Sequence, residues 1–309
     1  MGNNPSKKKP NNKSRKNSNK PERQNSLESN EETISRISTT TYFISEEVET
    51  ERLQQYHYLI KHLFDGNFLS PIHELLNSAP CKVLDLGCGP GTWVLDMGST
   101  YYNNKKSVFV GIDISPTFPN QIKPANTQFI QANILDGLPF ENNEFDFVYI
   151  RALGLSFSET QWLELILPDI LRVIKPGGWI EFNEPGPDAK NYGPYYKKLV
   201  DVHNLEMSIG DIDPKIILKY KEWLLSNSKL TNVQEEVRYV PIGSWDENNK
   251  LGEICQENFN TYLKNMETCI SNHLNISIEE YDQLLTKFFQ ECNELKSQFP
   301  FRCIYAQKL

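Results

Sequence analysis

The segment KVLDLGCGPGTWVLDMG, residues 82–98, constrains the fold of this 309-residue chain more than any other. An apolar run typical of a buried strand ends in three glycines at alternate positions, Gly87, Gly89 and Gly91, and an apolar segment with helical spacing follows. Glycines at a strand–turn–helix junction let the backbone approach a ligand closely. The segment therefore predicts a ligand-binding loop at the carboxyl end of a strand.

Apolar runs and helical patterns alternate along most of the chain. Strands are predicted at 82–86, 107–113, 127–133, 145–150, 179–184, 232–245 and 301–309. Helices are predicted at 49–66, 91–102, 158–175, 195–210, 213–228, 251–273 and 277–299, the last opening with a Ser277-x-x-Glu280 capping box. Strands that alternate with helices favour an α/β fold, a doubly wound and mostly parallel sheet covered on both faces.

The residues around the glycine loop discriminate between ligands. No Lys follows Gly91, as a phosphate-binding P-loop requires, and the G-x-G-x-G spacing departs from the G-x-G-x-x-G of dinucleotide sites. Asp85 just before the loop would repel a pyrophosphate and suits an ammonium group. Asp113, which ends the next strand, can accept hydrogen bonds from both ribose hydroxyls. A positively charged nucleoside without phosphate fits these residues, which describes S-adenosylmethionine.

At these residues the sequence resembles the class I, seven-stranded S-adenosylmethionine-dependent methyltransferases. Their D/E-x-G-x-G-x-G motif matches residues 85–91, ANILDGLPFENNEFDFVYIR aligns with their adenine-binding segment, and LRVIKPGGWIEFNE resembles the turn into their fifth strand. Asn133 replaces the usual Asp and loses its charge assistance. The resemblance implies a Rossmann-like methyltransferase fold and the following cofactor-binding residues: Asp85, Gly87, Cys88, Gly89, Gly91, Asp113, Ile114, Asn133 and Ile134.

A finer resemblance covers nearly all of the chain beyond residue 40. Segments such as TYFISEEVETERLQQYHYLIKHLFDGNFLSPI, PIGSWDENNKLG and YAQKL look like the LaeA-like methyltransferases of fungi. Arg52, Leu53 and His57 match that family's helix over the cofactor pocket, whereas Tyr56 replaces a more usual Gln. The family is associated with regulation of secondary metabolism and development, which implies regulatory protein partners, and its methyl acceptors are mostly undefined.

Methyl transfer from a sulfonium needs positioning more than covalent catalysis. Where the acceptor must lose a proton, the candidate catalytic residues are Glu184, Tyr149 and His57, with Arg151 as a clamp for a substrate carboxylate. Each has a structural alternative: a cofactor contact or a turn cap for Glu184, a surface ion pair for Arg151, and packing for the other two. The acceptor is predicted to be a small molecule or a protein side chain. The alternatives are a cofactor-binding regulator with little catalysis and a membrane-tethered enzyme with a lipid-like acceptor.

Charge and cysteine content exclude other classes. Residues 1–23 contain eight Lys or Arg and one Glu and so carry a net charge of +7. Because the whole chain has a net charge of −8, the remaining 286 residues carry −15. An acidic body disfavours nucleic acid as a partner. The six cysteines form no C-x-x-C pair and have no paired histidines nearby, so no metal site and no disulfide framework are predicted.

The amino-terminal segment carries competing localisation signals. Met1-Gly2-Asn3-Asn4-Pro5-Ser6 fits the pattern for N-myristoylation at Gly2, and a run of lysines follows. An acyl chain and a basic patch together can hold a protein on a membrane surface. The same basic run could instead be a nuclear localisation signal, or a solubilising segment with no targeting role. With no secretory signal and no apolar spanning run, we expect an intracellular protein that is cytoplasmic, membrane-associated or nuclear.

These patterns divide the chain into four segments. We expect a disordered basic tail at 1–40, an N-terminal helical cap at 41–80 and a cofactor-binding core at 81–185. Residues 186–309 are expected to supply helical insertions around the acceptor pocket and the last two strands of the sheet.

Overall fold

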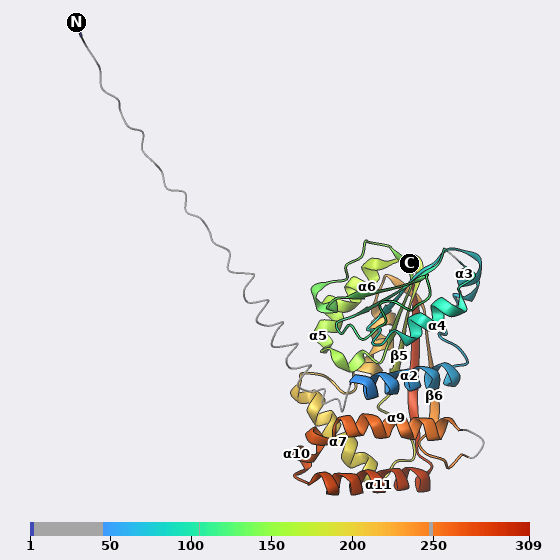
Figure 1. The fold of residues 1–309 in the computed structure, drawn as a ribbon, viewed down its shortest axis with the longest axis vertical. Helices are drawn as coiled ribbons and strands as arrows, with labels where there is room; N and C mark the ends of the chain where they lie inside the picture. Colours follow the sequence, from blue (N-terminus) through green and yellow to red (C-terminus); the bar gives the residue numbers. More distant parts are fainter. Residues whose placement is uncertain (3–45, 105, 247–249) are drawn as a thin grey trace. The chain divides into compact units, whose positions relative to one another are not determined.

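The computed structural model describes residues 1–2, 46–104, 106–246 and 250–309. The chain divides into two units, residues 1–40 and 41–309, and the helices and strands of the described residues belong to the second (Figure 1). The predicted disordered tail, apart from Met1 and Gly2, lies outside the described residues.

A seven-stranded sheet forms the centre of the second unit. Its strand order is β3-β2-β1-β4-β5-β7-β6. Strand β7 runs in the opposite direction to the other six strands and pairs antiparallel with β5 and β6. The strands are β1 (Lys82–Leu86), β2 (Val108–Asp113), β3 (Thr127–Gln131), β4 (Phe145–Arg151), β5 (Ile174–Pro185), β6 (Leu230–Pro241) and β7 (Gln298–Lys308). The order reverses between β1 and β4, where ligands bind in open α/β sheets. The predicted doubly wound, mostly parallel sheet is confirmed.

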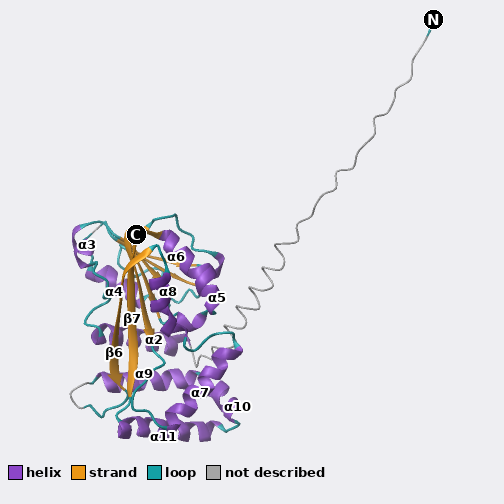
Figure 2. Cartoon of the chain, turned by 180° about the vertical axis from the view of Figure 1, so that it is seen from behind, coloured by secondary structure: helices purple, strands orange, loops and turns teal. Residues whose placement is uncertain are grey.

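Helices cover the faces and one end of this sheet. They are α2 (Glu46–Leu63), α3 (His73–Ser78), α4 (Thr92–Thr100), α5 (Glu159–Gln161), α6 (Leu167–Val173), α7 (Pro194–Ile209), α8 (Tyr220–Ser226), α9 (Leu251–Asn265), α10 (Glu267–Leu274) and α11 (Ile278–Leu295). Short 3-10 turns are η1 (Ile134–Asp136), η2 (Gly154–Ser156) and η4 (Ile216–Lys219), and η3 (Trp162–Ile166) is a π-helical turn between α5 and α6. Figures 1 and 2 both show α2, α9 and α11 lying across the end of the sheet.

Alternation along the strands divides the core into two layers. Leu84 and Val148 point to the face covered by α6 and α8, whereas Val83 and Phe147 point to the face covered by α3 and α4. Because successive side chains of a strand point to opposite faces, continuous apolar runs are needed to fill both layers. These are the runs from which the strands were predicted.

A third apolar cluster joins the cap helix to the C-terminal helices. Tyr56 and Leu59 of α2 pack with side chains of α7, α9, α10 and α11, and with Phe301 of β7. The predicted capping box is present at the start of α11. The predicted 251–273 helix is instead two helices that meet at Met266, and the predicted 213–228 helix begins only at Tyr220, after a 3-10 turn. In the described part of the chain, no helix has the length and apolar character needed to cross a bilayer.

Candidate active site

The glycine loop connects β1 to α4 with three left-handed residues. Gly87, Gly89 and Gly91 have φ values of 75°, 52° and 76°. A Cβ on Gly87 would lie 2.7 Å from Leu153 Cδ1, and one on Gly91 would lie 2.5 Å from the ring of Phe129. The outer two glycines are therefore required by both conformation and packing. The middle one is required by conformation alone, since a Cβ there would contact only Leu53 of α2, at 3.7 Å.

Two carboxylates lie at adjacent strand ends beside this loop. Asp113 accepts hydrogen bonds from the Gly89 amide at 2.8 Å and from the Ser115 amide at 2.9 Å. Asp85 is only 3% exposed, and no hydrogen bond is among the causes that shift its pKa. Burial raises the pKa of Asp85 to about 7, while Arg151 opposes the shift and Asp113 adds to it. A buried carboxylate without a donor is a fitting partner for a ligand ammonium group.

Other residues implied by the resemblance occupy less direct positions. The Asn133 side chain accepts from the Leu135 amide at 3.0 Å and so caps η1. Ile134 is 8% exposed and packs in the core, whereas Ile114 is 42% exposed after β2. Cys88 is buried against Gly111, where a Cβ would lie 2.8 Å from its sulfur. Of this group, Ile114 offers the most apolar surface to a ligand.

A chain of polar contacts connects α2, α4 and β4. His57 is fully buried, with Nε2 3.0 Å from Asp96 Oδ2 and Nδ1 2.9 Å from Arg151 Nη1. A guanidinium only donates, so Nδ1 is the acceptor and Nε2–H donates to Asp96. Lys61 also donates to Asp96, at 2.6 Å. Burial lowers the pKa of His57 to about 4, against the opposing hydrogen bond to Asp96. With both ring nitrogens occupied, His57 is arranged to orient Arg151.

Glu184 lies at the carboxyl end of β5 and is 1% exposed. Its two oxygens accept from the backbone amides of Leu153 at 3.1 Å and Gly154 at 3.2 Å. Burial raises its pKa to about 8, although these two bonds and the charge of Arg151 oppose the shift. This carboxyl group is therefore close to its protonation midpoint at neutral pH, as a general acid or base requires.

Two tyrosine hydroxyls in the electrostatic surroundings of Glu184 have no partner among the described residues. They belong to Tyr56 of α2 and Tyr220 of α8, and both are buried. Glu184 raises the pKa of each further, after burial as the first cause. A Cβ on Gly154 would lie 2.9 Å from the Tyr220 hydroxyl and 3.2 Å from Glu184 Oε2, so these two side chains converge on one point. Buried polar groups without partners are typical of ligand sites.

Two further residues near the site serve packing and positioning. Tyr149 is fully buried and stacks on Trp93, with ring centroids 4.2 Å apart. Glu181 of β5 is fully buried and accepts from the amides of Leu69 and Ser70 and from the Ser70 hydroxyl and the Cys303 thiol. Glu181 was not predicted from the sequence, and neither were Tyr56 and Tyr220 as site residues.

The predicted residues thus fall into three groups. The glycine loop and the two aspartates surround one end of β1 and β2. Arg151 connects that end to Glu184, because its charge acts on the pKa of both Asp85 and Glu184. Tyr149 lies deeper, in the aromatic core.

Comparisons with known proteins agree with this geometry. Residues 83–178 match the family model described as a methyltransferase domain. The sheet topology, the glycine loop and the matches to known methyltransferases together identify the chain as a class I S-adenosylmethionine-dependent methyltransferase. S-adenosylmethionine is its methyl donor.

Its similarity to individual proteins is distant but extends over nearly the whole length. The N-methyltransferase verN of Clonostachys rogersoniana is 25% identical over 286 residues, which cover 91% of this chain and 96% of that protein. The N-methyltransferase gliN of Aspergillus fumigatus is 25% identical over 274 residues, covering 85% and 94%. A solved structure of Haemonchus contortus phosphoethanolamine N-methyltransferase 2 with S-adenosyl-L-methionine has 17% identity and a TM-score of 0.48, covering 82% of this chain and 57% of that one.

These relatives correct two finer expectations. They are named as N-methyltransferases, so the resemblance to the LaeA-like proteins is not supported. The comparisons also give no support to acylation at Gly2, and the lysine run that follows Gly2 lies outside the described residues.

Proposed function

We propose that the protein methylates a nitrogen atom of a small-molecule natural product, with Glu184 as the group that receives the acceptor's proton. The observation that carries this proposal is the buried Glu184 carboxyl, whose pKa is raised to about 8 beside the unpartnered hydroxyls of Tyr56 and Tyr220. The names of verN and gliN support nitrogen as the acceptor atom.

The donor is assigned to the loop side of the site. Asp85 would hold the ammonium group of the donor, Asp113 its ribose hydroxyls, and Ile114 with Asn133 its adenine ring, above the glycine loop. When bound, S-adenosylmethionine supplies a methyl group on a positively charged sulfur that a nucleophile displaces directly. Arg151, oriented by His57, favours the ionised forms of both Asp85 and Glu184 and so balances part of their charge.

The acceptor is assigned to the opposite side, beneath α2 and α8. As the acceptor nitrogen forms its bond to the methyl carbon, the carbon–sulfur bond breaks and the nitrogen loses a proton. Glu184, as the carboxylate, takes up that proton. Tyr56 and Tyr220 would orient the acceptor through their free hydroxyls. The described residues of 46–78 and 186–309 would then form the walls of the acceptor pocket.

Acceptor chemistry can be tested with matched substrates. Purified protein with a deuterated-methyl donor is offered small primary amines, each paired with the isosteric alcohol and thiol, and products are identified by mass. We expect label on the amines and none on the alcohols. Efficient labelling of the alcohols, with the amines unlabelled, would contradict nitrogen as the acceptor atom.

A further inference from the structure

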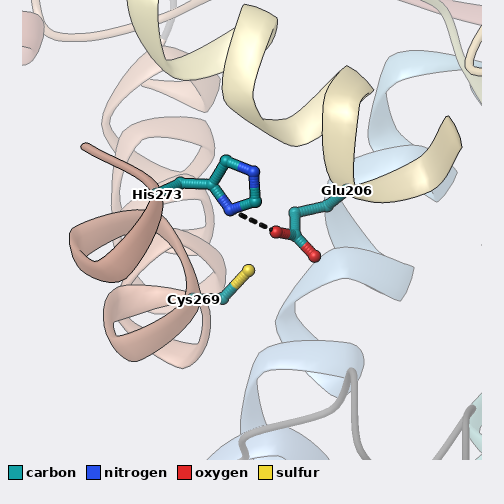
Figure 3. A group of neighbouring side chains, drawn as sticks. All are labelled: Glu206, Cys269 and His273. Carbon is teal, nitrogen blue, oxygen red and sulfur yellow. Dashed lines mark ion pairs between the residues drawn. The ribbon is translucent and has the colours of Figure 1, made fainter. Parts of the chain in front are cut away.

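A group of three side chains outside the active site combines the donor atoms of a metal centre. Glu206 of α7 and Cys269 and His273 of α10 each offer one ligand atom, and these atoms all lie within 4.8 Å of one another. Figure 3 shows the three side chains pointing toward one another, with Glu206 on a separate helix from the other two.

Helix geometry produces this convergence. Cys269 and His273 are four residues apart on α10, so they lie one above the other on the same helix face. That face is turned toward α7, where Glu206 Oε1 lies 2.6 Å from His273 Nδ1. The side chains of Glu206 and His273 are 16% and 29% exposed, so an ion and a water molecule can reach them from solvent.

No Lys or Arg of the described residues forms an ion pair with this group. Among the ion pairs of the described residues, Glu206 has His273 as its sole partner. Glu206 therefore faces a sulfur and an imidazole nitrogen rather than a Lys or Arg.

We propose that Glu206, Cys269 and His273 bind Zn²⁺ or another borderline divalent cation, with water in the fourth position. Thiolate and imidazole ligands favour such ions over Mg²⁺ and Ca²⁺, which prefer oxygen. On binding, the Cys269 thiol gives its proton to solvent, and the proton that His273 Nδ1 donates to Glu206 is lost to solvent or replaced by one on Nε2. The sulfur and Nδ1 then bond the metal in place of their contacts with Glu206. The ion would connect α7 to α10 within the C-terminal helices. The sequence predicted no metal site because the ligands come from two helices and form no C-x-x-C or paired-histidine motif.

Cobalt substitution tests this site directly. Chelator-treated, reduced protein is titrated with Co²⁺ and followed by absorption. We expect one equivalent to produce a near-ultraviolet thiolate-to-cobalt charge-transfer band together with tetrahedral d–d bands, all removed by Zn²⁺. The band should disappear in Cys269→Ser and weaken strongly in His273→Ala. It should persist in His62→Ala, a control at an exposed histidine of α2.

The outcomes decide between a metal centre and a simple ion pair. Circular dichroism first shows that each variant is folded. Absence of a charge-transfer band in the wild-type protein would overturn the proposal, and so would a band that survives Cys269→Ser. A rise in the thermal unfolding midpoint with Zn²⁺, present in the wild type and absent in Cys269→Ser, would support the proposed link between the helices.

Discussion

Buried carboxyl groups at the strand ends give the site its chemical character. Asp85 and Glu184 have raised pKa values because burial disfavours their ionised forms. Neither group has a full set of partners within the described chain. No hydrogen bond is among the causes that shift the pKa of Asp85, and Glu184 has only two backbone amides as donors. In the proposed function, ligands supply what is missing: an ammonium group to Asp85 and an N–H group to Glu184.

Replacing Asp85 with Asn should therefore weaken donor binding and leave the fold intact. The variant loses a charge-assisted bond to the donor's ammonium group, so the Kd for S-adenosylmethionine is expected to rise about 10–100-fold. Titration calorimetry measures this, with Asp201→Asn on the exposed surface of α7 as the control. An unchanged Kd in the Asp85 variant would remove Asp85 from the donor site.

The residues proposed for the donor side were easier to select from the sequence than those proposed for the acceptor side. The glycine loop, Asp85 and Asp113 lie on two adjacent strands with a known spacing, so local patterns suffice. Tyr56 and Tyr220 come from helices far apart in the chain, and only the tertiary fold places both near Glu184. The two hydrogen bonds of the His57 ring could not be predicted either, because Asp96 and Arg151 lie on other elements.

At the scale of elements, the strands followed directly from their apolar runs. Boundaries of the C-terminal helices were less predictable. The break between α9 and α10 at Met266 has no Gly or Pro to mark it, and Met266 itself is buried in the third cluster. Packing against α2 and α7, rather than local propensity, determines where these helices end.

Glu181 connects an element of the cap to the sheet. Its carboxyl group holds the Leu69–Ser70 segment, which precedes α3, against β5 and β7. Glu181→Ala should lower the free energy of unfolding by roughly 3–5 kcal/mol, because several buried donors lose their acceptor at once. Urea unfolding at neutral pH measures the change. A loss below about 1 kcal/mol, in the range typical of surface substitutions, would contradict this positioning role.

At the scale of the whole molecule, the candidate active site lies between the parallel part of the sheet and the helices that cover it. The parallel part of the sheet carries the donor loop, and α2 with the C-terminal helices covers the carboxyl end of the strands (Figure 1). The matches to verN and gliN span nearly the full length of those proteins, so this cover is part of the shared length rather than an appendage. The fold was predictable from the alternation of strands and helices along the sequence. The packing of α2 and the C-terminal helices around Glu184 was not.

Buried carboxyls should also make the stability of the ligand-free protein depend on pH. Between pH 6.5 and 8, the folded state holds protons on Asp85 and Glu184 that the unfolded chain has already lost. The free energy of unfolding should therefore fall as pH rises through this window, by about 1–3 kcal/mol. His57, with its lowered pKa, acts in the opposite sense only below about pH 6.5.

Denaturant unfolding at pH 6.5 and 8 checks this dependence in the wild type and in Glu184→Gln. The variant should show a smaller fall, because it carries no ionisable group at that position. Stability that rises with pH in the wild type, or an equal fall in both proteins, would be inconsistent with the buried carboxyl.

The role of Glu184 is tested most directly by the single-turnover rate of amine methylation as a function of pH. The wild-type rate should rise with an inflection near pH 8, where Glu184 becomes a carboxylate. Glu184→Gln should bind S-adenosylmethionine normally, react about 100-fold or more slowly and lack that inflection. Glu279→Gln, at an exposed position of α11, should match the wild type. A Glu184→Gln protein with the wild-type rate and pH profile would contradict Glu184 as the proton acceptor.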